Sequence, residues 1–74
     1  MRSAAAFPSR VDIESIAPGL MRLVVDGSEW GSAMEIVGGG WFVIQRGRKR
    51  NRKPISSSAL RDRVARMAYE ERKR

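Results

Sequence analysis

The sequence predicts an α+β domain in which a three-stranded antiparallel β-meander packs one face against a C-terminal α-helix. Two patterns carry this prediction. Three short apolar segments between residues 20 and 45 are separated by glycine-containing turns, as the strands of a meander are. The C-terminal segment instead repeats apolar side chains at i, i+4, i+7 and i+8, the spacing of one buried helix face. A chain of 74 residues has room for one such domain.

The N-terminal residues 1–9 are small and polar apart from one phenylalanine, and we expect a flexible arm there. The domain then occupies residues 10–74. Ser9 is able to cap a short helical turn that runs to Ile16, and the Pro-Gly pair that follows ends it. The alternation of Val11 and Ile13 also fits a strand, but we favour the helical turn.

Three strands are expected, at Leu20–Val25, Ala33–Val37 and Trp41–Gln45. In the first two, period-two alternation directs one set of apolar side chains toward the core, namely Met21, Leu23, Val25, Met34 and Ile36. The third strand is apolar on both faces, which is typical of a central or doubly covered strand. A loop over residues 26–32 joins the first pair of strands. Three glycines, which accept positive φ, join the second pair.

The C-terminal helix is expected to begin near Ala59, after three serines that are able to cap it. Its buried stripe consists of Leu60, Val64, Met67 and Ala68. One helix covers one face of a sheet only. The other face is therefore a candidate contact for a second copy of the chain, in a homodimer, or for the N-terminal segment.

The formal net charge of +7 is concentrated in the C-terminal part of the chain. Residues 1–45 contain three basic and five acidic residues, a net charge of −2, whereas residues 46–74 contain twelve basic and three acidic ones, a net charge of +9. Six of the cations and no acid lie in the segment Arg46–Lys53, between the third strand and the helix. A patch of one sign attracts polyanions and releases their counterions. The segment therefore predicts nucleic-acid binding, with a solvated loop that has no target as the alternative.

The predicted nucleic-acid contacts are seven residues of this segment, Arg46, Arg48, Lys49, Arg50, Asn51, Arg52 and Lys53. Arginine and asparagine side chains read bases as well as attract phosphates. Three residues of the helix are candidates for extending the same surface, namely Arg61, Tyr69 and Arg72.

The triplet Arg46-Gly47-Arg48 resembles the core of AT-hook and bacterial AT-hook-like segments, although the flanking prolines are missing on the near side. The resemblance implies that both arginines lie along the floor of an A·T minor groove, which attracts arginine when it is narrow. Arginine-rich loops also bind RNA. DNA is therefore favoured only slightly over RNA.

A second hypothesis comes from Trp30, in the loop between the first two strands, because tryptophan is frequent at interface hot spots. In this alternative the chain is a small adaptor or inhibitor of the kind that phages and mobile elements encode. It would bind an acidic surface of a protein partner through the basic loop, Trp30 and the exposed sheet face. Loop tryptophans in small domains also fold back over a sheet edge. The second tryptophan, Trp41, is expected in the core.

The chain contains no His and no Cys, which excludes disulfides, thiolate catalysis, a soft zinc site and an imidazole base. We expect no catalytic residue, no cofactor and no metal. The remaining enzymatic alternative is a small basic ribonuclease toxin that uses Arg66, Tyr69 and Glu70. No apolar run is long enough to span a membrane and no signal peptide is indicated. We expect a cytoplasmic protein without a membrane partner, associated with the nucleoid if it binds DNA.

Overall fold

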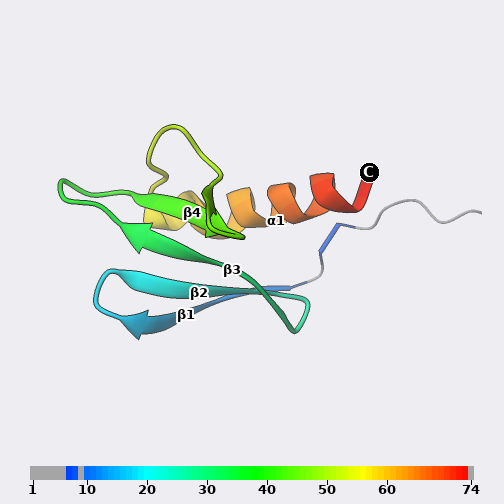
Figure 1. The fold of residues 1–74 in the computed structure, drawn as a ribbon. Coiled ribbons are helices and arrows are strands. Elements are labelled where there is room, and N and C mark those ends of the chain that lie inside the picture. The colour runs from blue at the N-terminus through cyan, green and yellow to red at the C-terminus, as the bar shows by residue number, and fades with distance from the viewer. Residues whose placement is uncertain (1–6, 9, 74) are drawn as a thin grey trace, which may run out of the picture.

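The computed structural model describes Phe7, Pro8 and residues 10–73, which form five antiparallel strands and one helix (Figure 1). The elements are β1 (Val11–Ala17), β2 (Leu20–Val25), β3 (Ser28–Glu35), β4 (Trp41–Gln45), β5 (Arg48–Lys49) and α1 (Ser57–Lys73). Each strand pairs with its neighbour in the sequence, so the sheet is a meander with the order β1-β2-β3-β4-β5. The α+β class and the bounds of β2 and β4 are confirmed. The prediction of three strands is wrong, because the sheet has five.

The segment for which a helical turn is predicted forms β1 instead. Val11 pairs with Val25, and Ile13 pairs with Leu23. A strand here satisfies backbone groups of β2 that would otherwise stay unpaired, and this outweighs the local capping signal. Ser9, which would supply the cap, lies outside the described residues, as do residues 1–6 of the expected arm.

The predicted loop over residues 26–32 is a two-residue turn followed by the first half of β3. Asp26 and Gly27 have φ values of 48° and 85°. Positive φ at both positions is what a type I′ turn requires, and this turn matches the twist of a hairpin. The register places Ala33 beside Met21, so Ala33 is fully buried and the neighbouring Met34 is 47% exposed. The predicted inward orientation of Met34 is therefore wrong.

The core lies between α1 and one face of the sheet (Figure 1). From the sheet it receives Val11, Leu23, Val25, Ala33, Trp41 and Val43, and from the helix Leu60, Val64, Ala65 and Ala68. The predicted helix stripe is confirmed except at Met67, which is only partly buried. The helix begins at Ser57, two residues before the expected start.

The opposite face of the sheet carries the half-buried side chains of Phe42 and Ile44, and no described helix or strand packs on it. β4 is an internal strand but is not covered on both faces. A second copy of the chain on this face stays a prediction. Within the described residues, no helix has the length and apolar character needed to cross a membrane.

Candidate nucleic-acid interface

The segment Arg46–Lys53 is not one loop but a tight turn, a short strand and a second loop. Arg46 and Gly47 form the turn between β4 and β5, with φ values of 54° and 75°. As in the β2–β3 hairpin, positive φ at both positions fits a type I′ turn. The β5 residue Arg48 then pairs with Gln45, and the amide of Arg50 donates to the carbonyl of Val43 at 2.7 Å. The cations are therefore anchored to β4.

At Asn51 the backbone pairing with β4 is interrupted, and the Asn51 side chain forms hydrogen bonds to the backbone in its place. Its Oδ1 accepts from the amide of Val43 at 2.8 Å, and its Nδ2 donates to the carbonyls of Trp41 at 3.2 Å and Lys53 at 2.6 Å. Pairing with β4 resumes at Ile55. Nucleic-acid contact is predicted for Asn51, but the residue is buried and its amide is fully used inside the fold. The Asn51 side chain therefore has a structural role.

The exposed cations of the segment fall into two pairs. Arg46 and Arg48, the turn pair, lie at one end of β4, and Arg52 and Lys53, the loop pair, lie in the excursion at its other end. Because a strand rises about 3.3 Å per residue, the two ends of β4 are about 13 Å apart. All four side chains belong to exposed residues, and no ion pair forms between them and any residue that the structure describes.

Lys49 lies between the two pairs but on the opposite side of the sheet from α1. Its Nζ is 4.3 Å from the centroid of the Phe42 ring, a cation–π contact on the uncovered face. The residue is exposed. Its charge therefore remains accessible on the uncovered face of the sheet, at the β5 edge.

Arg50 differs from the other cations because it is bound inside the domain. Its Nη1 lies 3.3 Å from Glu71 Oε2 and also donates to Gln45 Oε1. Its guanidinium carbon is 5.7 Å from the centroid of the Trp30 ring. The indole Nε1 of Trp30 donates to Glu71 Oε1 at 3.0 Å. These four residues, the Glu71 cluster, join β3, β4 and the end of β5 to the last turns of α1.

The Glu71 carboxylate is stabilised in its charged form. Burial alone would raise the pKa of Glu71, but hydrogen bonds from Trp30 and Gln45 and the charges of Arg50 and Arg46 outweigh burial and lower the pKa. Glu71 is therefore ionised at neutral pH. It compensates the charge of Arg50 most directly, through their ion pair.

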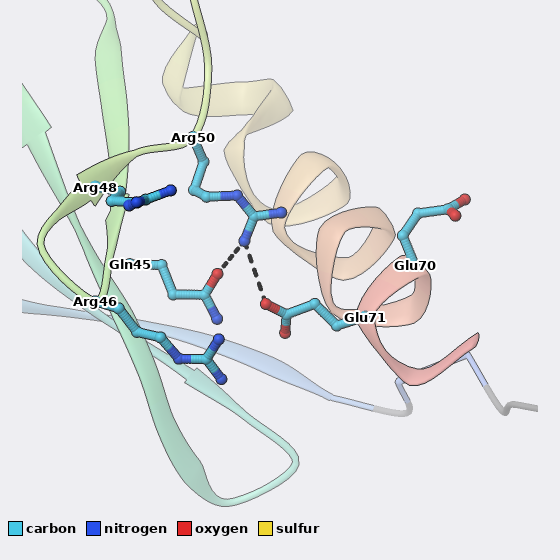
Figure 2. A pocket seen from close by; sticks show the side chains of 6 residues that line it. All are labelled: Gln45, Arg46, Arg48, Arg50, Glu70 and Glu71. Carbon is cyan, nitrogen blue, oxygen red and sulfur yellow. Dashed lines mark hydrogen bonds and ion pairs between the residues drawn. The ribbon is translucent and has the colours of Figure 1, made fainter. Parts of the chain in front are cut away.

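A pocket of about 420 Å³ lies between the β4–β5 turn and the C-terminal end of α1. Its lining residues are Gln45, Arg46, Arg48, Arg50, Glu70 and Glu71. Figure 2 shows the three arginine side chains extending from the hairpin toward the helix, Glu71 pointing toward them and Glu70 pointing away. The pocket is cationic on the hairpin side.

The sequence contains a signal for this pocket that the charge count alone misses. Arg48 and Arg50 are spaced two residues apart, and side chains with this spacing share one face of a strand, whereas Arg46 precedes them in the turn. Arg48 lies opposite the buried Gln45, so both belong to the face that α1 covers. The spacing does not reveal that the end of a helix closes the pocket.

The triplet Arg46-Gly47-Arg48 forms the tip of a hairpin and not an extended segment. The conformation that the AT-hook resemblance implies, with both arginines along a groove floor, is therefore not the one adopted here. Contact with phosphates does not need that conformation.

The helix candidates contact other parts of the fold. Arg61 Nε donates to the carbonyl of Val11 at 3.0 Å, at the β1 edge and thus across the sheet from β5. Arg72 pairs with Asp26 at 2.7 Å. The ring of Tyr69 lies 5.4 Å from that of Phe7. None of the three adjoins the turn pair in the pocket lining.

The chain matches no known protein-family model, no curated protein and no solved structure at a significant level. Its function has to be inferred from its own residues. The exposed cations along β4 and the pocket at the β4–β5 turn are the features with the most definite chemistry.

Proposed function

We propose that the protein binds nucleic acid by contacting the phosphate backbone with the exposed cations of the Arg46–Lys53 segment. The observation that carries this proposal is an acid-free segment of cations that is anchored to β4 by β5 at one end and by Ile55 at the other. Five of the six cations belong to exposed residues, and among the six only Arg50 is ion-paired with another residue that the structure describes. Cations on an anchored backbone lose less freedom on binding than cations on a free tail, so more of the free energy of counterion release is retained as affinity.

The spacing of the two pairs favours DNA slightly over RNA. The turn pair and the loop pair flank a strand about 13 Å long. The major groove of B-DNA is about 12 Å wide, so the two pairs would contact phosphates on opposite strands of a duplex. An RNA duplex offers a wide groove only on its shallow minor-groove side, because its major groove is deep and narrow and closed to side chains.

The proposal is tested by two variants of equal net charge. The first replaces the five exposed cations of the segment with Gln, namely Arg46, Arg48, Lys49, Arg52 and Lys53. The control replaces five cations elsewhere, namely Arg10, Arg22, Arg63, Arg66 and Lys73. Both variants carry a net charge five units below that of the wild type. Fluorescence anisotropy with labelled duplex DNA and RNA should show loss of binding in the first variant only, and equal losses in both would overturn the proposal.

The alternative function, an adaptor or inhibitor that binds an acidic protein surface, uses the same cations but needs Trp30 as an anchor. Trp30 is partly buried in β3, and its indole N–H is bound to Glu71. These contacts favour a structural role for Trp30. A stoichiometric protein recovered from nuclease-treated lysate, with no nucleic acid bound when nuclease is omitted, would support the alternative instead.

A further inference from the structure

The pocket at the β4–β5 turn has more hydrogen-bond donors than the domain itself uses. Arg46 and Arg48 line it, and neither forms an ion pair with any residue in the described part of the chain. Each guanidinium presents five N–H donors in a planar fork. The nearby carboxylate, Glu71, accepts hydrogen bonds from Trp30 and Arg50, so it acts on Arg46 through its charge and not through an ion pair.

We infer that this pocket is a binding site for a single phosphate group, held by Arg46 and Arg48 with Arg50 behind them. The planar guanidinium fork matches phosphate oxygens, and both arginines line the pocket, so each can offer a bidentate contact to a bound phosphate. Three arginines against two glutamates leave the lining with a surplus positive charge, and Glu70 points away from the arginines (Figure 2). An anion is therefore the ligand that the pocket favours.

The site is largely formed before a ligand arrives. The turn fixes the backbone of Arg46 at positive φ, and Arg48 is paired with Gln45 in the sheet. Arg50 is held by Gln45 and Glu71. Only the outer parts of the Arg46 and Arg48 side chains have to be ordered on binding, which lowers the entropic cost.

The volume of the pocket indicates how the phosphate is presented. About 420 Å³ is within the range of small-molecule sites and exceeds what one phosphate group fills. The pocket therefore also has room for atoms attached to the phosphate. An internal phosphate of a polynucleotide and a terminal or free phosphate ester present the same oxygen atoms to the arginines. The inference that the bound phosphate belongs to a nucleic acid rests on the proposed function. The inference that the pocket binds phosphate does not.

The first experiment uses inorganic phosphate and no nucleic acid. Titration at constant ionic strength, followed through the side-chain Nε–Hε resonances of the arginines by NMR, should give saturable shifts at Arg46 and Arg48. The double variant Arg46→Gln/Arg48→Gln should bind about tenfold more weakly, since it loses charge-assisted contacts. The matched control, Arg52→Gln/Lys53→Gln, removes the same charge outside the pocket and should weaken binding less than about twofold.

A conservative variant controls for the case in which Arg46→Gln/Arg48→Gln loses affinity only because it misfolds. Arg46→Lys/Arg48→Lys keeps the charge but removes the fork, and should lie between the wild type and the Gln variant in phosphate affinity. Equal loss in the pocket variant and the loop control would show only a diffuse charge effect and would overturn the site. Absence of saturable shifts in the wild type would overturn it as well.

The second experiment identifies the source of the phosphate with oligonucleotides that carry either a 5′-phosphate or a 5′-hydroxyl. If the 5′-phosphate raises the affinity for the oligonucleotide and this gain disappears in Arg46→Gln/Arg48→Gln, the pocket binds a terminal phosphate. Equal affinities that both fall in this variant assign it to an internal phosphate. Phosphate binding in a protein that retains no DNA or RNA would overturn the proposed function alone, and nucleic-acid binding without saturable phosphate binding would overturn the pocket alone.

Discussion

The indole nitrogen of Trp30 in β3 donates a hydrogen bond of 3.0 Å to the carboxylate of Glu71 in the last turns of α1. Forty-one positions separate the two residues in the sequence. The same carboxylate pairs with Arg50, so this contact connects the sheet, the helix and the wall of the phosphate pocket. The stability of the domain and the charge of the pocket therefore both depend on the Glu71 side chain.

Replacing Glu71 with Gln should change stability and anion affinity in opposite directions. The free energy of unfolding should fall by about 1 kcal/mol, because the charge-assisted bonds to Arg50 and Trp30 are weakened. Phosphate should bind several-fold more tightly, because a negative charge close to the anion is removed. Urea unfolding and phosphate titration measure the two effects. Glu70→Gln, on the neighbouring exposed residue, is the control, and a matching stability loss there would contradict the role of Glu71.

The contribution of Glu71 to stability should depend on pH in a defined direction. The pKa of Glu71 is lower in the folded protein than in the unfolded chain, where it is about 4.3. Its stabilising effect is therefore complete above the unfolded value and is lost as the pH falls through the folded value. The difference in thermal stability between the wild type and Glu71→Gln should be constant near neutral pH and shrink in acid. A difference that grows in acid would show that folding does not lower the pKa of Glu71.

Asn51→Ala should destabilise the domain although the residue lies in the basic segment. The change leaves the buried amide of Val43 without its partner, whereas the carbonyl of Trp41 keeps its bond from the amide of Ile55. We expect a loss of about 1 to 3 kcal/mol in urea unfolding, the cost of one unsatisfied buried group. Arg52→Ala, at the next and exposed position, should change stability by less than about 0.5 kcal/mol. Similar effects of the two changes would argue against the structural role of Asn51.

Gly31→Ala should disturb the pairing of β3 with β4 next to the pocket. A Cβ at this position would lie 2.5 Å from the carbonyl oxygen of Ile44, which is backbone and cannot move aside alone. We expect a loss of about 2 to 3 kcal/mol, as for an overpacked core site. Ser32→Ala, one residue further along β3, serves as the control in the same denaturation series. Wild-type stability of Gly31→Ala would show that the strands separate more easily than the structure indicates.

The salt dependence of nucleic-acid binding should report the number of accessible cations. Five phosphate contacts predict a slope of about −4.5 in a plot of log affinity against log salt. Removing Arg46 and Arg48 should reduce the slope to about −2.7, since each contact contributes about −0.9. The control pair Arg63→Gln/Arg66→Gln should leave the slope unchanged. Equal reductions in both variants would indicate that the whole surface, and not the segment, attracts the nucleic acid.

The sequence by itself determines the elements whose signals are local. Leu20–Val25 and Trp41–Gln45 are apolar segments bounded by turn residues, and both have the predicted bounds. The helix is defined by its own periodicity, because Leu60, Val64 and Ala68 repeat on one face. The segregation of positive charge into the C-terminal part follows from counting alone.

Only the tertiary structure decides the rest, because it depends on partners distant in the chain. Val11–Ala17 is a strand because β2 offers it backbone partners, and the same residues in isolation fit a helical turn equally well. Ala33 faces the core because its register with β2 overrides the larger side chain of Met34. Arg50, one of six similar cations in the sequence, is ion-paired and partly buried because the fold brings Glu71 to it. Long-range pairing therefore determines which charges of the segment remain available to a phosphate.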